Sequence, residues 1–376
     1  MKGIRAFCYF TLVRAFRDVP FSTDPVIDES EDFSRPQADP DEVIDWLIED
    51  LKACEPSAAA TYANTSYTKG RMTQAAIRAL IADMCLWRGR YDECIEYCNR
   101  VISDTHNPLS LESAMSYSRN LYVNGSSPET IFELQYNTAN YSNYAVAEFY
   151  GDATQGYAQQ IVPYDFTGAG RELFGETDLR ARTALYLPTD GTPSVRKYTS
   201  YLTATELMAA TVTSSSYYQV NAYESNWIIY RLPDIYLMKA EAMAELGTDI
   251  EGAFKTACIT YDRANPEAGA GSLSFADYNS QEAVINFIYD ERQREFLFEG
   301  KRYFDLLRRI IHHRERFKTI VDTYLLPKYA DLDQSTVSSK LSSYDALYMP
   351  INATEMRANR LLKQNPFYNT STGITH

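Results

Sequence analysis

The strongest constraint on the fold is a spacing of small residues and glycine that is typical of paired helices. In the segment "AAIRALIADMCLWRGRYDECIEYCNRVIS", Ala82 is followed by Gly89 at a turn, Tyr91 two residues later, and the small Cys94 at the start of a second helix. This is the spacing of a tetratricopeptide repeat. Because such units bury their faces only against neighbouring units, the sequence predicts a stack of helix pairs.

The segment "YLMKAEAMAELGTDIEGAFKTACITYDRA" repeats this pattern later in the chain. Ala240, Gly247 and Ala253 fall at nearly the same offsets as the landmarks of the first segment. The four letters "TDIE" match a capping box, so Thr248 is the expected N-cap and Glu251 the expected third helical residue.

Two looser helix pairs complete the predicted stack. The N-terminal pair covers about residues 2–17 and 40–54, and Asp39 is the expected N-cap of its second helix, since Pro40 follows it. The last pair begins near Gln281 and turns at Gly300. We therefore predict a mainly α fold, a tetratricopeptide-like α-helical repeat scaffold of about four helix pairs with a large irregular, tyrosine-rich inserted subdomain.

The predicted inserted subdomain lies between the second and third pairs. Residues 105–229 show little helical periodicity and many turn residues, and a structureless loop of that length is improbable in a compact domain. We expect short helices, loops and a hairpin around "SPETIFELQY". The predicted segments are the first two pairs (1–104), the insertion (105–229), the last two pairs (230–311) and a C-terminal segment packing back on the scaffold (312–376).

Composition excludes several functional classes. The formal net charge of −14 repels phosphate backbones and argues against a nucleic-acid partner. No apolar run is long enough for a membrane helix. The six cysteines form no CxxC pair and lie in helical stretches, so we expect buried free thiols and neither a metal nor a cofactor.

Catalytic motifs are absent from the sequence. The chain has four histidines, and it contains no GxSxG, no P-loop and no HExxH. A glycosidase-like pair of carboxylates stays open as an alternative, because two acids far apart in sequence can meet in space. Asp152 and Asp165 in the insertion are the candidates for such a pair.

Tyrosine is concentrated in the insertion, where asparagine and glutamine are interleaved with it. One interpretation is that these rings fill a core and hydrogen-bond through their hydroxyls. The other is a ligand site, since flat amphipathic rings beside amide side chains suit a sugar, which has apolar faces and a rim of hydroxyls. The candidate ligand-binding residues are Tyr141, Asn143, Tyr144, Tyr157, Tyr218 and Trp227.

Two acids in the stretch "DERQREFLFEGKRYFDLLRR" fall in the apolar phase of a helix. Glu291 and Glu295 follow Val284 and Ile288 at spacings of three and four residues, which place them on the same face of a helix. A buried carboxylate is costly unless it is paired, so we expect a structural ion-pair cluster rather than a catalytic centre. The candidate partners are Arg292, Arg302, Arg308 and the distant Arg231.

Seven segments together resemble the SusD/RagB-like outer-membrane nutrient-binding proteins. They occur in that family's order from residue 4 to residue 368, and each is degenerate on its own. The segments are "IRAFCYFTLVRAFRDVPF", "VIDWLIEDLKAC", "GRMTQAAIRALIADMCLWRGRYDECIEYCNRVI", "SPETIFELQY", "YRLPDIYLMKAEAMAELG", "YDERQREFLFEGKRYFDLLRR" and "LYMPINATEMRANRLLKQNPFY".

The resemblance implies a function without catalysis. Such proteins are cell-surface lipoproteins of the outer membrane that capture glycans and deliver them to a SusC-like TonB-dependent transporter. The family's ligand residues form no fixed motif, so the resemblance assigns none here. The runner-up function is a tetratricopeptide-type protein- or peptide-binding scaffold without glycan affinity.

The sequence departs from the family pattern in three places. It shows no signal peptide and no lipidation cysteine, so the chain as given is expected to be soluble. Arg17 stands where the family usually has glycine, and Pro233 falls inside the motif "YRLPDIYLMKAEA". None of these departures changes the predicted fold.

Overall fold

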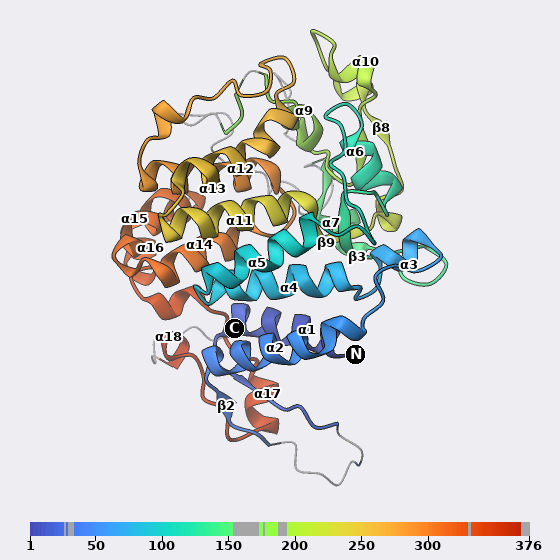
Figure 1. The fold of residues 1–376 in the computed structure, drawn as a ribbon. Helices are drawn as coiled ribbons and strands as arrows, with labels where there is room; N and C mark the ends of the chain where they lie inside the picture. Colours follow the sequence, from blue (N-terminus) through green and yellow to red (C-terminus); the bar gives the residue numbers. More distant parts are fainter. Residues whose placement is uncertain are drawn as a thin grey trace. The chain divides into compact units, whose positions relative to one another are not determined.

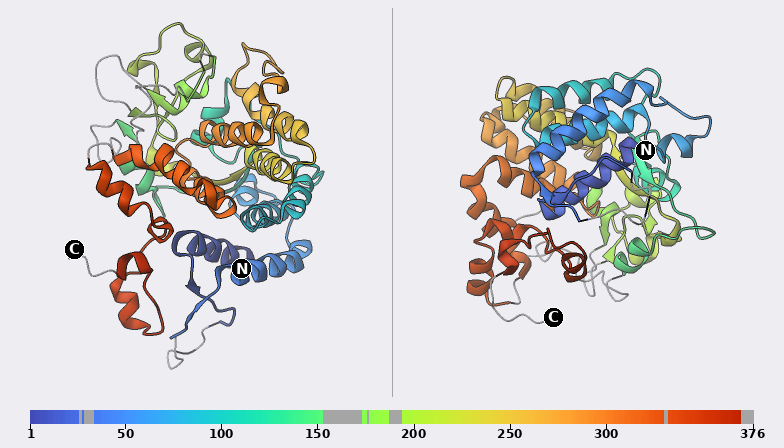
Figure 2. Two further views of the ribbon diagram at one scale, coloured as in Figure 1. Left: turned by 90° about the vertical axis from the view of Figure 1, so that its left-hand side faces the viewer. Right: turned by 90° about the horizontal axis from the view of Figure 1, so that it is seen from below.

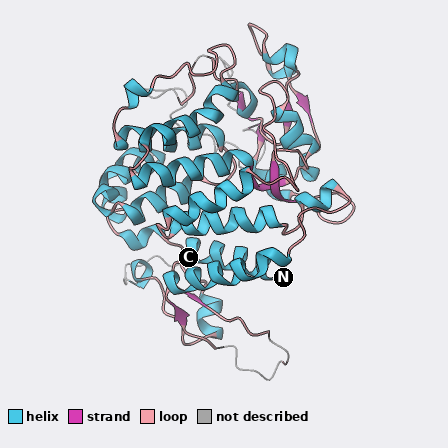
Figure 3. Cartoon of the chain, in the orientation of Figure 1, coloured by secondary structure: helices cyan, strands magenta, loops and turns pink. Residues whose placement is uncertain are grey.

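The computed structural model describes residues 1–25, 28, 34–152, 173–175, 177–186, 194–329 and 332–369. These residues are mainly helical, and most of the short strands lie between residues 130 and 231 (Figure 3). The predicted fold class is therefore confirmed. The helices predicted for the four pairs are present as α1 (Lys2–Phe16), α2 (Pro40–Cys54), α4 (Gln74–Trp87), α5 (Tyr91–Ile102), α11 (Leu232–Leu246), α12 (Ile250–Ala264), α13 (Gln281–Glu295) and α14 (Arg302–His312).

The remaining helices are short. The α-helices are α3 (Thr65–Lys69), α6 (Tyr117–Arg119), α7 (Tyr144–Phe149), α9 (Arg180–Ala184), α10 (Ala204–Leu207), α15 (Phe317–Ile320), α16 (Gln334–Lys340), α17 (Ala353–Ala358) and α18 (Pro366–Asn369). The 3₁₀-helices used below are η5 (Ala222–Glu224) and η6 (Phe275–Tyr278).

The chain forms two compact units, Met1–Cys54 with Phe304–His376, and Glu55–Tyr303. In the second unit, α11 lies at the centre of the helix stack and packs against α4, α5, α12 and α13 (Figure 1). In the left view of Figure 2, the cyan, yellow and orange helices of this stack again lie side by side. The larger unit thus contains the two repeat segments and the insertion together.

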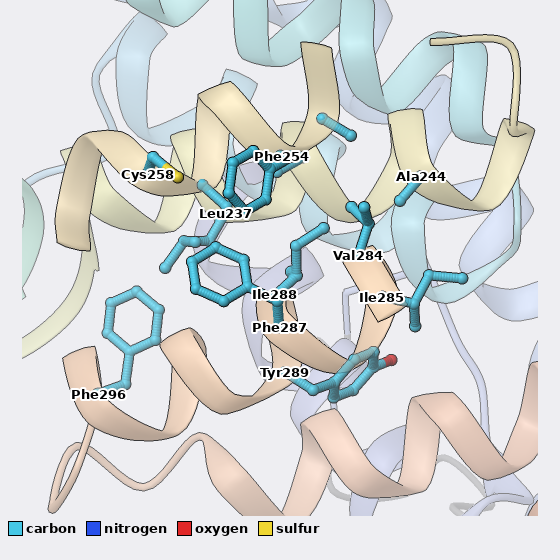
Figure 4. Packing of buried hydrophobic residues seen from close by; sticks show 13 residues of the cluster. Leu237, Ala244, Phe254, Cys258, Val284, Ile285, Phe287, Ile288, Tyr289 and Phe296 are labelled. Atoms are coloured by element: carbon cyan, nitrogen blue, oxygen red, sulfur yellow. The ribbon is translucent and has the colours of Figure 1, made fainter. Parts of the chain in front are cut away.

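Buried aliphatic and aromatic side chains hold α11, α12 and α13 together. Phe254, Phe287 and Ile288 interdigitate with Leu237 at the centre of this cluster (Figure 4). The small side chain of the buried Ala240 lets the helix axes approach closely. Each fully buried Leu, Ile or Phe contributes about 1.5–3 kcal/mol, so this cluster is a main source of the stability of the stack.

The turns within the pairs follow the predicted glycines. Gly89, Gly247 and Gly300 have φ values of 69°, 70° and 73°, in the left-handed region that side chains rarely adopt. Gly247 also ends α11 by donating its N–H to the Met243 and Ala244 carbonyls. Pro233 is tolerated because it lies in the first turn of α11, where a missing N–H costs little.

Of the two predicted N-caps, one differs from the structure and one agrees with it. The N-cap of α12 is Asp249 rather than Thr248, and its Oδ1 accepts the Gly252 N–H at 2.8 Å. A carboxylate beside the positive end of the helix is favoured over a hydroxyl. The N-cap at Asp39 is confirmed, since its Oδ1 accepts the Asp41 and Glu42 N–H groups at 2.9 and 3.2 Å.

The strands pair over long sequence distances. β3 (Thr130–Leu134) lies in "SPETIFELQY", but it pairs antiparallel with β9 (Trp227–Arg231) instead of forming a hairpin. β9 closes the insertion just before α11, so this pair brings residues 130–134 beside the C-terminal end of the insertion. The other ladders are β1 (Val19–Pro20) with β2 (Gln37–Ala38), β4 (Gly151–Asp152) and β5 (Leu185–Tyr186) on either side of β6 (Ser194–Val195), and β7 (Ser200–Tyr201) with β8 (Tyr218–Gln219).

In the smaller unit, the C-terminal part is hydrogen-bonded to the N-terminal part. The Met349 N–H donates to the Ala15 carbonyl at 2.9 Å, and Asn359 Nδ2 donates to the Arg35 carbonyl at 2.7 Å. Arg17 has a φ of 67°, which explains why glycine suits this position. Its guanidinium donates to Asp18 and Asp345, both at 2.8 Å, and these ion pairs offset part of the strain.

The cysteines are free, as predicted, but not all are buried. Cys85, Cys94, Cys98 and Cys258 are buried, whereas Cys8 is exposed on α1. The expectation of burial is wrong for Cys8, because its position on α1 faces solvent between the buried Ala6 and Phe10. Cys54 is partly exposed at the end of α2.

Candidate functional site

Three exposed tyrosine rings lie on two segments of the insertion that are bonded to each other. Tyr141 and Tyr144 are 77% and 62% exposed, and Tyr223 in η5 is 42% exposed. The Tyr144 and Tyr223 rings meet edge to face, with centroids 5.6 Å apart. We call these three residues the aromatic surface. A group of exposed rings, unlike a single one, is typical of a surface that a partner or ligand covers.

Asn143 fixes the geometry of this surface. Its Oδ1 accepts the Val146 N–H at 3.1 Å and so caps α7, while its Nδ2 donates to the Ser225 carbonyl at 2.8 Å. Its backbone N–H donates to the Tyr223 carbonyl at 2.7 Å. The side chain is buried with both amide groups engaged. Asn143 therefore positions Tyr144 against Tyr223.

The loop that carries Tyr141 is closed by its own backbone. Asn137 and Tyr141 exchange two N–H to carbonyl bonds of 2.9 and 3.0 Å, and Asn137 Oδ1 accepts the Asn140 N–H at 2.9 Å. Thr138 Oγ1 donates to Glu224 Oε1 at 2.6 Å, which ties the loop to η5. A short, doubly tied loop holds the Tyr141 ring in solvent without a covering side chain.

Tyr218 belongs to a second exposed aromatic platform. It is the register partner of Tyr201 in the β7–β8 ladder, and the two rings stack with centroids 5.3 Å apart and planes at 19°. Tyr218 is 50% exposed, and the Arg119 guanidinium lies 5.1 Å from the centre of the Tyr201 ring. The stack presents one flat ring to solvent and supports it from behind.

Trp227 lies in a more enclosed aromatic cluster. Its ring stacks on the buried Tyr198, with centroids 5.3 Å apart and planes at 18°, and Tyr150 contacts both rings. The Tyr150 hydroxyl donates to the Phe298 carbonyl at 2.6 Å. Part of the Trp227 ring is therefore packed against other aromatic rings, whereas Tyr141 and Tyr144 are exposed.

Part of the predicted site lies outside the described residues. This applies to Tyr157 and to Asp165, one member of the carboxylate pair considered above. The sequence did not select Tyr201 or Tyr223 as site residues. Tyr201 is identified by its position opposite Tyr218 in the β7–β8 ladder, and Tyr223 by its ring contact with Tyr144. Neither contact follows from a local sequence pattern.

A network of buried ion pairs lies in the same unit. Its carboxylates are those of Glu129, Asp178, Glu291, Glu295 and Glu299, and its cations are those of Arg180, Lys197, Arg231, Arg263 and Arg294. We call these ten residues the charge network. It has as many cations as carboxylates, which is the condition under which buried charges are tolerated.

Glu295 is the centre of the charge network. One of its oxygens accepts from Arg231 Nη1 at 2.5 Å and from Arg263, and the other accepts from Arg180 Nη1 at 2.8 Å. Glu291, one turn earlier, accepts from Arg180 at 2.7 Å and from Arg294 at 2.9 Å. Both acids are buried on α13, in the apolar phase of the helix.

The insertion supplies two of the cations. Arg180 starts α9, and Lys197 follows β6 and donates to Glu299 Oε1 at 2.7 Å. Arg231, at the end of β9, also donates to Glu299, at 2.8 Å. The charge network therefore fastens the insertion to the helix stack.

The environment shifts the pKa values of these groups. Burial alone would raise the pKa of Glu295, but Arg263, Arg231 and Arg180 outweigh it and hold the pKa well below its usual range. Burial likewise opposes ionisation of Glu299, yet Arg231 and Lys197 lower its pKa to about 2. Both acids therefore stay ionised at neutral pH, which makes them poor general acids.

The arginines named from the sequence have different roles. Arg231 is a partner of Glu295, as described above. Arg302 donates to the Tyr289 carbonyl at 2.8 Å, Arg308 donates to Asp305 at 3.0 Å, and the Arg292 guanidinium lies 5.1 Å from the centre of the Phe296 ring. These three brace the ends of α13 and the start of α14.

The described part of the chain shows neither a metal site nor a membrane-spanning helix. No group of three or more His, Cys, Asp or Glu side chains there is arranged to hold a metal ion. Within the same residues, no helix has the length and apolar character needed to cross a membrane. The exposed aromatic groups are the features that point most directly to ligand binding.

The fold and these surfaces define a helical-repeat protein whose insertion carries exposed aromatic rings. The model of the SusD family matches residues 122–368. The SusD-like protein P38 of Formosa agariphila (strain DSM 15362 / KCTC 12365 / LMG 23005 / KMM 3901 / M-2Alg 35-1) is 25% identical over 346 residues, covering 81% of this chain and 65% of that protein. The chain belongs to the SusD family.

Solved structures agree with this assignment of the fold. A SusD superfamily protein from Bacteroides thetaiotaomicron VPI-5482 has a TM-score of 0.68 at 20% identity, covering 98% of this chain and 76% of that one. A laminarin binding SusD-like protein has a TM-score of 0.66 at 20% identity, covering 97% of this chain and 77% of that one. The chain spans less than two thirds of the length of the curated relative P38.

Proposed function

We propose that this chain binds an oligosaccharide or polysaccharide without catalysis and delivers it at the cell surface to a SusC-like TonB-dependent transporter. The proposal is supported by membership of the SusD family and by a solved neighbour that binds laminarin. The observation that carries it is the aromatic surface, whose uncharged rings are exposed to solvent. The hydrogen-bonded side-chain amide of Asn143 holds this surface in place.

The chemistry of the aromatic surface suits a sugar. A pyranose ring presents axial C–H groups that pack on an aromatic face, and its hydroxyls bond to phenols and amides. Tyr141 and Tyr144 are the proposed stacking residues, with Tyr218 and Trp227 as further contacts. Asn143 acts as a positioning residue, and Tyr157 remains a proposed contact outside the described residues.

A glycan array followed by calorimetric titration tests this proposal. Neutral glucans and other plant and algal glycans should be included, because the array must identify the ligand without prior choice. Tyr141→Ala and Tyr144→Ala should weaken binding of the selected glycan, whereas Tyr329→Ala, which removes an exposed tyrosine of the other unit, should not. No binding to any glycan, with capture of a peptide partner instead, would favour the scaffold alternative.

The absence of catalysis and the delivery step need separate tests. Incubation of the bound glycan with the purified chain should release no shorter products, and their release would contradict the non-enzymatic proposal. Association with a SusC-like transporter should appear as co-purification of the two proteins from an outer membrane that contains both. A chain that binds the glycan but never the transporter would contradict only the delivery step.

A further inference from the structure

A pocket of about 440 Å³ lies between α12, η6 and α13, apart from the aromatic surface in sequence. This volume is in the range of small-molecule sites. Its lining includes three aromatic rings, Tyr261, Tyr278 and Phe287, and three charged side chains, Asp277, Asp290 and Arg294. The combination of flat apolar walls with a few polar groups is typical of a binding site.

The aromatic rings of the pocket are held in place by the helix core. The Phe287 and Tyr278 centroids are 5.0 Å apart, and both rings pack on Phe254. Figure 4 shows Phe254 and Phe287 within the buried α11–α13 cluster. The Tyr261 ring lies 6.3 Å from Phe287. The pocket wall is therefore rigid on its aromatic side.

The charged groups of the pocket have unused bonding capacity. Neither the Asp277 nor the Asp290 carboxylate has a hydrogen-bond or ion-pair partner among the described residues. Arg294 donates its Nε–H to Glu291 at 2.9 Å, and its two terminal nitrogens have no acceptor in the described part of the chain. Groups of this kind at the wall of a pocket are available to a ligand.

The charges of the lining residues indicate the sign of the charge on that ligand. Arg294 belongs to the charge network, where cations and carboxylates are equal in number, so its charge is already compensated by Glu291. Asp277 and Asp290 are additional carboxylates, so the described residues that line the pocket carry a net negative charge. Negative charge beside aromatic faces favours a cation, because ring faces also attract positive groups.

We propose that this pocket binds an amine-bearing saccharide, with its protonated amino group at Asp277 and Asp290. The apolar face of the sugar ring packs on Tyr278 and Phe287, and the terminal nitrogens of Arg294 donate to its hydroxyl oxygens. A linear lysine side chain would satisfy the carboxylates but would offer fewer acceptors to Arg294. The pocket and the aromatic surface share no residue, so the proposal does not depend on the proposed function.

Calorimetric titration with methyl glucosaminide and with short glucosamine oligomers tests the proposal, at a pH below the pKa of the amine. The N-acetylated and the neutral glucose analogues serve as ligand controls. Asp290→Asn and Asp277→Asn should each weaken binding of the amine-bearing sugars about tenfold. Glu267→Gln, which neutralises an exposed acid after α12, should leave binding unchanged.

Four outcomes would overturn the proposal. These are no measurable binding of the amine-bearing sugars, equal affinity for the N-acetylated analogues, unchanged affinity in both aspartate variants, and tighter binding of a lysine peptide than of the amino sugars. Melting temperatures of the variants separate loss of binding from loss of folding. Tyr144→Ala distinguishes the two sites, because it should weaken glycan binding at the aromatic surface and leave binding at this pocket intact.

Discussion

The charge network and the aromatic surface use the same insertion in opposite ways. The charge network buries side chains such as Arg180 and Glu295, which are usually exposed, whereas the aromatic surface exposes Tyr141 and Tyr144, whose rings could be buried. Burial of paired charges fastens segments to one another, while exposure of rings leaves apolar area for a ligand. The contrast separates residues that hold the fold from those proposed to act on a ligand.

The largest expected effect is on stability. Glu295→Gln leaves Arg180, Arg231 and Arg263 with one carboxylate fewer in a buried site, and breaking such a network costs about 3–5 kcal/mol. The melting temperature should therefore fall by many degrees, while the folded fraction retains its glycan affinity. The exposed Glu251→Gln, which loses an i,i+4 pair with Lys255, is the matched control and should leave the melting temperature nearly unchanged, because solvent screens this pair.

Acid should weaken the same network. The pKa of Glu299 is about 2 in the folded chain and lies below its unfolded value, so its stabilising contribution is complete above about pH 4.3 and is lost as the pH falls toward 2. The loss is on the order of 3 kcal/mol. Urea unfolding midpoints measured across this range should fall steeply in the wild type and less steeply in Glu299→Gln. Equal slopes would show that Glu299 is not ion-paired.

An intermediate effect is expected on binding. Tyr144→Ala removes an exposed ring and should weaken glycan binding about tenfold, or about 1.4 kcal/mol, with little change in melting temperature. Asn143→Ala should weaken binding indirectly and also lower stability, because it removes the cap of α7. If Tyr144→Ala changes only stability, the ring has a packing role.

A smaller effect is expected at the α12 N-cap. Asp249→Ala removes the bond to the Gly252 N–H and should cost about 1 kcal/mol, whereas Thr248→Ala should cost less. Thermal unfolding of the two variants side by side checks this difference. A larger loss in Thr248→Ala would restore the cap predicted from the sequence.

The smallest effect is expected at Arg17. Glycine would relieve about 1–2 kcal/mol of left-handed strain. It would also remove the half-exposed pairs with Asp18 and Asp345, worth about 0–1 kcal/mol each. The two terms nearly cancel, so Arg17→Gly should change stability by less than about 1 kcal/mol. A loss above about 2 kcal/mol would mean that the ion pairs dominate.

The sequence predicts the helices well because their signals are local. The glycines at 89, 247 and 300, the cap at Asp39 and the apolar phase that buries Glu291 are all set by neighbours a few residues away. The partners of Glu295 are different, since Arg180 and Arg263 come from α9 and α12. No periodicity links them to Glu295, and only the tertiary fold brings them together.

The candidate site is less predictable for the same reason. Tyrosine enrichment indicates the region, but it does not distinguish the exposed Tyr141 from the buried Tyr198. That difference depends on which ring the β3–β9 closure and the Asn143 cap leave uncovered. The pairing of Tyr201 with Tyr218 depends on strand register, which a one-residue shift would abolish.

The most direct test of the separation between scaffold and surface is a titration of the array-selected glycan into Glu295→Gln and Tyr144→Ala, with the melting temperature of each sample recorded. The account predicts a lower melting temperature with unchanged dissociation constant for Glu295→Gln, and the reverse for Tyr144→Ala. A Glu295→Gln variant that melts like the wild type but has lost the glycan would contradict it.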